Sequence, residues 1–380
     1  MYNQFFCTFA VPNCYILFNY YLDVLFNYYL QCANLQTFVM LFVFNELKYI
    51  KLNLTHISMN KFQLQKNTRF LVTGGAGFIG SNIIEHLLRL GFFVRCMDNL
   101  STGNKENIKE FVNNPNFEFV CADIRNFAEC KDVMTDIDFV LHEAAWGSVP
   151  RSLKEPFFYY DNNAKGFINV LEAAKCSNIK RLIYASSSSI YGNSPSLPRI
   201  EGEEGQVLSP YALTKENNEK WAMAYTQFYG IETIGLRYFN VFGKKQNPNG
   251  EYAAVIPKFI SEMKKGIIPL INGDGLQSRD FTYVDNVVQA NILACTAEKK
   301  AVGRSYNIAS GTRITIHDLY QTLARVYDIK EEPYYAEERT GDIKDSFANI
   351  DLAKEFLGYY PQYSFEEGLS CTVKWYNQTL

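Results

Sequence analysis

The sequence predicts an α/β fold, in which a doubly wound parallel sheet is joined to a smaller mixed α/β domain. From residue 69 onward, short apolar runs of strand character alternate with stretches whose apolar residues recur at helical spacing. Helices that connect parallel strands in this way cover both faces of one sheet. The strand-like runs are 69–73, 92–97, 116–121, 138–142, 181–186 and 233–238, and the clearest helical stretches are 167–175 and 211–228.

A glycine-rich turn joins the first strand to the first helix. Gly74, Gly77 and Gly80 follow the strand at a spacing of three. In a strand–turn–helix unit these glycines permit the tight turn, the approach of backbone N–H groups to a pyrophosphate and close packing of helix on strand. The positive end of the helix then stabilises the phosphates. Asp98 ends the second strand, where a carboxylate binds the adenosine ribose and repels a 2′-phosphate, so we expect NAD rather than NADP.

Composition argues against several other classes of protein. The 380 residues are 47% hydrophobic and 20% charged with a net charge of −3, so no basic excess exists to neutralise a nucleic acid. The nine cysteines lack CxxC pairs and the four histidines are few, which predicts no metal site. Free thiols are typical of a reducing cytosol, and we expect a cytoplasmic protein.

The first 66 residues differ from the rest of the chain. They are crowded with Phe, Tyr and Asn, include the near repeat LFNYYL at 17–22 and 25–30, and carry no basic residue before Lys48. A signal peptide begins with basic residues, and a membrane helix needs about 20 apolar ones. We therefore expect residues 1–66 to be an extension outside the fold, with Met59 as a candidate start. Contact with a membrane through this segment is the less favoured alternative.

The remaining chain divides into two predicted domains. We expect residues 67–240 to form a nucleotide-binding domain, and 241–380 a substrate-binding domain whose chain interleaves with the first. After Phe242 the regular alternation breaks into loops, which indicates the change. Ligands on parallel sheets bind beyond the carboxyl ends of the strands. The polar or small residues at those ends are Asp98, Asp123, Ala144 and Ala145, Ser186 to Ser189, and Asn240.

A tyrosine and a lysine stand one helical turn apart in the motif SPYALTK, residues 209–215. Tyr211 and Lys215 then share one helix face. A phenol is a poor base at neutral pH, but a neighbouring ammonium and an oxidised nicotinamide both favour the phenolate. Ser187, at the end of a strand, is placed to share the proton. These residues predict removal of a proton from a sugar hydroxyl.

The motifs TGGAGFIGS (73–81), SPYxxTK (209–215) and SSSSIYG (186–192) resemble the extended short-chain dehydrogenase/reductase family, whose Rossmann-type members act on nucleotide sugars. The resemblance covers residues 66–380. Three further stretches are similar to the bacterial UDP-N-acetylglucosamine 4-epimerases of that family. They are GSVPRS at 147–152, RYFNVFG at 237–243 with Gln246 and YAAVIPK at 252–258, and NGDG at 272–275 with SRDF at 278–281.

The resemblance implies a reversible oxidation at carbon 4 of the sugar. Tyr211 takes the 4-hydroxyl proton while carbon 4 passes hydride to NAD, and the 4-keto sugar turns over and takes the hydride back on its other face. No net oxidation occurs, so NAD stays bound between turnovers. The cofactor contacts that the resemblance implies are Gly74, Gly77, Phe78, Ile79, Gly80, Asp98, Asn99, Asp123, Ile124, Ala144, Asn163, Tyr211 and Lys215.

The resemblance also implies a set of substrate contacts. Asn240, Arg279 and Arg339 surround the UDP, and Asp342 touches its ribose. Arginine suits a pyrophosphate because its planar fork donates two hydrogen bonds. Ser346 matches a gate position that is tyrosine in epimerases restricted to non-acetylated sugars, and serine leaves room for an N-acetyl group. The remaining expected contacts are Ser148, Ser188, Ser189, Gln246 and Val255.

Two positions depart from the family pattern, and several alternatives stay open. Glu143 replaces a common glutamine, and Trp146 stands beside the expected sugar pocket, which leaves the preferred hexose open. UDP-hexuronic acid and UDP-glucose 4-epimerases are the main alternatives. A 4,6-dehydratase is disfavoured because Ser188 and Ser189 stand where it needs carboxylates. A non-catalytic NAD-binding protein is disfavoured because the catalytic residues are all present. Relatives pair through the helix bearing Tyr211, so we expect a homodimer.

Overall fold

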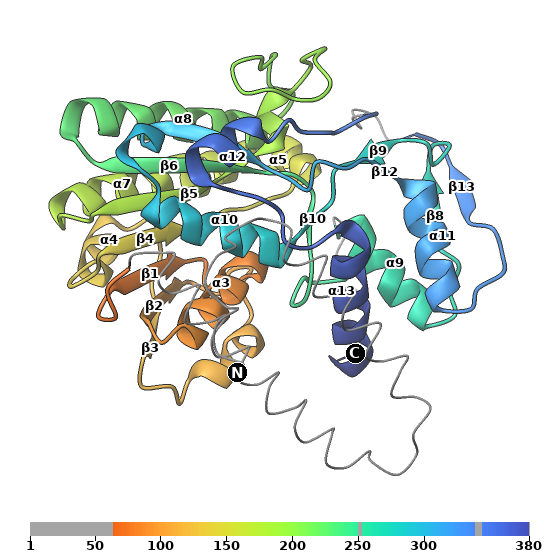
Figure 1. The fold of residues 1–380 in the computed structure, drawn as a ribbon, viewed down its shortest axis with the longest axis horizontal. Coiled ribbons are helices and arrows are strands. Elements are labelled where there is room, and N and C mark those ends of the chain that lie inside the picture. The colour runs from red at the N-terminus through yellow and green to blue at the C-terminus, as the bar shows by residue number, and fades with distance from the viewer. Residues whose placement is uncertain (1–63, 250–252, 339–343, 380) are drawn as a thin grey trace, which may run out of the picture. The chain divides into compact units, whose positions relative to one another are not determined.

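The fold is a seven-stranded sheet flanked by helices, seen in a computed structural model that describes residues 64–249, 253–338 and 344–379 (Figure 1). The strand order is β11-β6-β5-β4-β1-β2-β3, and every neighbouring pair is parallel. The strands are β1 (Arg69–Thr73), β2 (Phe93–Asp98), β3 (Phe117–Cys121), β4 (Phe139–His142), β5 (Arg181–Ser187), β6 (Glu232–Tyr238) and β11 (Arg304–Ile308). The predicted doubly wound sheet is therefore confirmed.

Helices cover both faces of this sheet because its strands are apolar on both sides. On one face, Val170 and Ala222 pack in one buried cluster with the strand residues Leu71, Val140 and Leu182. The other face is covered by the helix 284–296, which contacts the helix after the glycine turn and the strands β5 and β6. The helices on the first face are α4 (Phe127–Val133), α7 (Gly166–Cys176) and α8 (Pro210–Tyr229), and those on the second are α3 (Phe78–Arg89), α10 (Val284–Thr296) and α12 (Asp351–Leu357).

The strand order reverses between β1 and β4. β2 and β3 follow β1 on one side, whereas β4, β5 and β6 follow on the other. The connections therefore diverge at this point and leave a crevice at the carboxyl ends of the strands, which is where such sheets bind dinucleotides. Short helical segments border the crevice: η1 (Lys105–Asn107), η2 (Lys109–Phe111), α5 (Val149–Lys154), α6 (Pro156–Tyr159), the π-helical turn η3 (Tyr160–Lys165) and η4 (Ser188–Tyr191).

A second hydrophobic cluster is built on aromatic residues. The ring centroids of Phe242 and Phe281 both lie 5.7 Å from that of Phe365. Around them pack α9 (Val255–Lys264), α11 (Ile316–Val326) and α13 (Phe365–Thr379). The remaining elements are the pairs β7 (Val241–Phe242) with β10 (Thr282–Tyr283), β8 (Leu270–Asn272) with β13 (Tyr334–Ala336), and β9 (Ser278–Arg279) with β12 (Ile314–Thr315), and the turn η5 (Lys299–Ala301).

The described residues all belong to one compact unit. The strand β11 was not predicted from the sequence, because its run RSYNI mixes polar and apolar residues. It joins the sheet through the register that pairs Tyr306 with Leu236. The division at residues 240 and 241 stays a prediction. The predicted extension falls almost entirely outside the described residues, and within the described ranges no helix combines the length and apolar character that a bilayer-spanning segment requires.

Candidate active site

The glycine turn forms a cradle with no room for side chains. Gly74 has a φ of +67°, and a Cβ there would lie 2.7 Å from the backbone N of Ala144. A Cβ on Gly80 would lie 2.8 Å from Cα of Gly75, and one on Gly77 would lie 3.0 Å from the carbonyl oxygen of Gly74. Since Gly77 also precedes the first turn of α3, the open backbone N–H groups of that helix face the crevice.

A cavity of about 740 Å³ lies at this cradle. Its walls come from the carboxyl ends of β1, β2 and β4 and from the segment 245–249, with α13 on the far side. Its volume lies in the range of small-molecule and cofactor pockets. Of the predicted site residues, those that line it are Gly74, Gly77, Phe78, Ile79, Gly80, Asp98, Asn99, Ile124, Ala144 and Gln246.

Asp98 and Asp123 have different surroundings. The Asp98 carboxylate accepts hydrogen bonds from the backbone N–H groups of Ala76, at 3.0 Å, and Leu100, at 2.7 Å. Burial raises its pKa. The Asp123 carboxylate binds Asn99 and Arg125, and the Arg125 hydrogen bond lowers its pKa to about 2. Asp123 does not line the cavity. The Asp123 side chain therefore forms an ion pair with Arg125 and is not part of the cavity wall.

Asn163 holds a loop of the cavity wall. Its side-chain oxygen accepts a hydrogen bond from the backbone N–H of Trp146 at 2.9 Å, and its amide nitrogen donates to the carbonyl of Trp146 at 3.0 Å. The neighbouring Asn162 lines the cavity, whereas Asn163 lies behind it. The Arg151 guanidinium carbon lies 4.0 Å from the centroid of the Trp146 ring, which itself forms part of the wall. The side chain of Asn163 thus fixes the position of the Trp146 backbone in the cavity wall.

The predicted catalytic residues meet where β5 ends and α8 begins. Ser209 caps α8, and Tyr211 stands in the first turn. The side chains of Ser187 and Tyr211 are hydrogen-bonded to each other. Lys215, one turn later and almost fully buried, donates a hydrogen bond from Nζ to the carbonyl oxygen of Ala185 at 2.7 Å. The structure therefore brings these three residues together at the carboxyl ends of the strands, the end of the sheet at which the cavity lies.

Burial is the largest influence on the pKa values of Tyr211 and Lys215. Burial raises the pKa of Tyr211, and the hydrogen bond from Ser187 lowers it only in part. Burial also lowers the pKa of Lys215 to about 8, against the charges of Glu143 and Glu219. The Lys215 ammonium donates to the Ala185 carbonyl. Its predicted effect on Tyr211, together with that of an oxidised nicotinamide, stays a prediction.

A second cavity, of about 280 Å³, lies between the aromatic cluster and β9. Asn240, Val255 and Arg279 line it together. Asn240 has a φ of +35°, and its side chain donates to the carbonyl of Asp280 at 3.3 Å. The Arg279 guanidinium donates to the carbonyl of Ser278 at 2.9 Å. These three predicted substrate residues, far apart in sequence, therefore share one wall.

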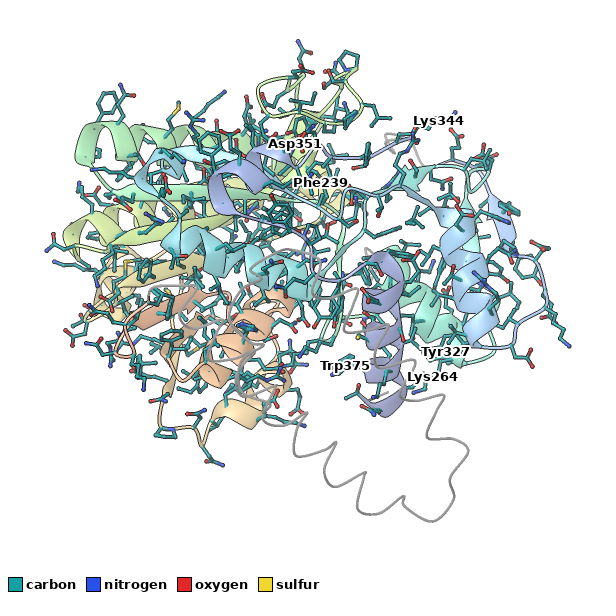
Figure 2. The ribbon with its side chains drawn as sticks, in the orientation of Figure 1. Phe239, Lys264, Tyr327, Lys344, Asp351 and Trp375 are labelled. Carbon is teal, nitrogen blue, oxygen red and sulfur yellow. The ribbon has the colours of Figure 1, made fainter. Side chains whose placement is uncertain are left out.

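Ser346 reaches the same region through the segment that begins at Lys344. Figure 2 labels Lys344 near the place where Figure 1, in the same orientation, labels β9 and β12. Its backbone N–H donates to the carbonyl of Ser278 at 3.0 Å, next to Arg279. The side chain of Asp345 binds Arg313 at 2.6 Å and so holds the segment in place. Two other predicted contacts, Arg339 and Asp342, lie outside the described residues.

The predicted hexose residues are more dispersed. Ser148 caps α5, where its hydroxyl accepts from the backbone N–H of Arg151 at 3.2 Å. Ser188 and Ser189 lie in η4, and the buried Ser189 hydroxyl has no hydrogen-bond partner in the described part of the chain. None of these serines lines either cavity. Gln246 lines the first cavity, and its side chain donates to the carbonyl of Val241 at 3.2 Å.

Sequence reasoning missed several wall residues. Trp375 and Tyr376, on α13, line the first cavity, and Trp375 is labelled in Figure 2. The Tyr376 hydroxyl donates to the carbonyl of Gln246. No local motif points to a helix 130 residues further along the chain. Glu143 was noted as unusual, and the structure makes it a buried wall residue.

The chain matches the model of the NAD dependent epimerase/dehydratase family over residues 70–309. It belongs to this family. NAD is accordingly its cofactor, and the glycine cradle, the cavity and Asp98 fit such a dinucleotide. The predicted class of enzyme, an NAD-dependent nucleotide-sugar 4-epimerase, is likewise confirmed by its relatives.

Three members of the epimerase family illustrate the similarity. The UDP-N-acetylglucosamine 4-epimerase of Methanobrevibacter ruminantium, solved in complex with UDP-N-acetylmuramic acid, is 39% identical with a TM-score of 0.79 and covers 83% of this chain and 100% of its own. The UDP-glucuronate 4-epimerase of Thermodesulfobacterium geofontis is 36% identical over 82% of this chain and 97% of its own. The UDP-glucose 4-epimerase of Mycolicibacterium smegmatis is 33% identical over 81% and 98%.

Proposed function

We propose that this epimerase interconverts UDP-N-acetylglucosamine and UDP-N-acetylgalactosamine for surface polysaccharide synthesis. The observation that carries the choice of sugar is the small side chain of Ser346, whose backbone N–H donates to the carbonyl of Ser278, next to the second-cavity residue Arg279. A hydroxymethyl group there leaves room for an N-acetyl substituent that a phenol ring would exclude. The 39% identity to the Methanobrevibacter ruminantium enzyme supports the same choice.

The chemistry assigned to the chain's own residues is proton transfer. Tyr211 removes the proton of the sugar 4-hydroxyl and returns it to the 4-keto sugar after the sugar has turned over. Ser187, hydrogen-bonded to the Tyr211 phenol, holds the oxygen in position. Lys215 supplies a buried positive charge at the Ala185 carbonyl. NAD held at the glycine cradle would supply a hydride acceptor and donor for carbon 4, and its nicotinamide charge would favour the phenolate.

The nucleotide half of the substrate is assigned to the second cavity. Arg279 and Asn240 supply donors for phosphate and uracil oxygens on its wall. Arg339 and Asp342 are assigned to the pyrophosphate and the ribose by resemblance. Ser148, Ser188, Ser189 and Gln246 remain the proposed hexose contacts.

The direct test is incubation of the purified protein with UDP-N-acetylglucosamine and no added cofactor. We expect conversion to the galacto isomer, with NAD recovered from the denatured protein in a ratio close to one per chain. Parallel incubations with UDP-glucose and UDP-glucuronate separate the alternatives that the relatives raise. Faster turnover of either sugar than of the acetylated one would overturn the assignment of the substrate.

A homodimer is proposed on the exposed face of α8. Trp221 and Met223 are 47% and 53% exposed, although both are large and apolar. The neighbouring Leu153 on α5 and Phe157 on α6 are 63% and 79% exposed. Pairing of two copies across α8 and the adjoining α5 and α6 would remove exposed apolar surface from water. Light scattering after size exclusion tests this, with a lower association constant expected for Trp221→Glu.

The location of the protein in the cytoplasm and the role of residues 1–66 are also proposals. We propose that the enzyme acts in the cytoplasm and that Met59 starts a functional chain. Cell fractionation of the full chain and of a chain that starts at Met59 tests both. Recovery of only the longer chain with membranes would favour a membrane contact.

A further inference from the structure

Glu143 is a buried carboxyl group on the wall of the first cavity. It directly follows β4, and its Oε1 accepts a hydrogen bond from the hydroxyl of Tyr238 at 2.8 Å. That hydroxyl in turn accepts from the side-chain amide of Asn291 at 2.8 Å, so its one proton is committed to Glu143. The other oxygen, Oε2, has no hydrogen-bond partner in the ranges described. Tyr238 therefore fixes one carboxyl oxygen of Glu143, and the other oxygen makes no hydrogen bond within those ranges.

The sheet register places Glu143 next to the anchor of Lys215. His142 on β4 pairs with Tyr184 on β5, so the next residues along, Glu143 and Ala185, are neighbours across the strands. The carbonyl of Ala185 receives the ammonium of Lys215 at 2.7 Å. The Glu143 side chain reaches the hydroxyl of Tyr238 on β6, the strand beyond β5. The Glu143 carboxyl and the Lys215 ammonium are thus held at neighbouring strand ends, and the charge of Glu143 raises the pKa of Lys215.

We propose that Glu143 is a positioning residue that acts through Lys215, by supplying the counter-charge that keeps this buried lysine protonated at the pH of turnover. The hydrogen bond from Tyr238 fixes where that charge lies. This inference rests on the proposed function of Lys215 in proton transfer by Tyr211.

The other ionisable groups around this pair do not supply the same charge. Glu219 also acts on Lys215, but both of its oxygens bind the Arg237 guanidinium, at 2.9 and 2.8 Å. His142 is neutral, since burial and the Lys215 charge lower its pKa to about 3. The ionisable side chains that face the pair are His142 on β4, Arg237 and Tyr238 on β6, and Tyr211 and Glu219 on α8. Glu143 remains as the carboxylate not already paired with an arginine.

Removal of the Glu143 charge shifts the pKa of Lys215 in a defined direction. Burial raises the pKa of Glu143 to about 7, so its carboxylate form predominates on the alkaline side of that pH. There the carboxylate raises the pKa of Lys215 against the effect of burial, and its removal lowers that pKa below about 8. Lys215 then loses its proton at a lower pH. The alkaline limb of the turnover profile, which we assign to this loss, moves toward acid.

The first experiment compares pH profiles of turnover between pH 5 and 10 for the purified holoenzyme. Glu143→Gln keeps an acceptor for Tyr238 but removes the charge, whereas Glu143→Asp keeps the charge. We expect the alkaline limb of the Gln variant to shift toward acid by about one unit, the usual size of such a charge effect. The Asp variant and the remote surface control Glu118→Gln should retain the wild-type limb. An unshifted limb in Glu143→Gln would overturn the proposal.

A double-mutant cycle provides a readout that does not need turnover. Glu143→Gln is combined with Lys215→Met, and the free energy of unfolding is measured at pH 8 for all four proteins. Without the ammonium, the buried carboxylate is uncompensated, so Glu143→Gln should stabilise the Lys215→Met variant more than it stabilises the wild type. Additive effects would overturn the charge coupling. Because the cycle is independent of the substrate, a coupled result together with an inactive enzyme would contradict the proposed function alone.

Discussion

Gly74→Ala tests whether the glycine turn holds the cofactor. Gly74 has a φ of +67°, which costs an L-residue about 1–2 kcal/mol. The added Cβ would also lie 2.7 Å from the backbone N of Ala144, and overpacking against a rigid wall costs about 1–3 kcal/mol. Both Gly74 and Ala144 line the first cavity, so relief of the contact must open the cradle.

Gly91→Ala is the matched control. Gly91 has a φ of +82° but no atom within 4 Å of its Cβ position, so it carries the backbone strain without the contact. The two variants then differ by the cost of the contact alone. We expect this cost to lower the NAD affinity of Gly74→Ala, relative to Gly91→Ala, by about tenfold to a hundredfold. The assay is the NAD content of the purified proteins, with titration of NAD into the stripped ones. Equal NAD content in Gly74→Ala and Gly91→Ala would refute the reasoning.

Three further variants probe the site. Ser346→Tyr should abolish turnover of the acetylated sugar while sparing UDP-galactose, and equal loss on both substrates would contradict the gate. Asp98→Ser should shift the affinity ratio of NADP to NAD by about tenfold or more in favour of NADP, because the like-charge repulsion of the 2′-phosphate is gone; an unchanged ratio in titrations would argue against the ribose contact. Burial raises the pKa of Asp280 to about 6, so its protonated form is favoured in the folded state and stability falls as the pH rises from about 4 to 6. The melting temperature of Asp280→Asn should therefore rise relative to wild type over that range, and a constant difference would contradict the assignment.

The sequence predicted those elements whose signals are local. The strands β1 to β6 were found within one residue at each end, because their apolar runs are bounded by turns. The glycine spacing likewise predicted the cradle. A Cβ on any of these glycines would crowd backbone atoms of the same turn or of Ala144, which follows the neighbouring strand β4. The strand β11 was missed because it becomes a strand only by pairing with β6.

Site residues whose partners come from elsewhere in the chain were harder to interpret. Asp123 stays a predicted cofactor contact, although its carboxylate binds Arg125, a local partner two residues further along. Asn163 lies behind the wall, where it holds the backbone of Trp146. The effect of Lys215 on Tyr211 was predicted from their spacing on one helix. That effect stays a prediction, and helical periodicity does not reveal that the Lys215 ammonium donates to the Ala185 carbonyl.

The most direct test of the account is the rate of epimerisation of UDP-N-acetylglucosamine by Tyr211→Phe. The variant keeps the buried ring but loses the phenol that Ser187 binds. We expect the rate to fall by about 10²- to 10⁴-fold, the usual contribution of a general acid–base, while the NAD content stays at the wild-type level. Isomerisation at the wild-type rate would contradict the assignment of proton transfer to this side chain.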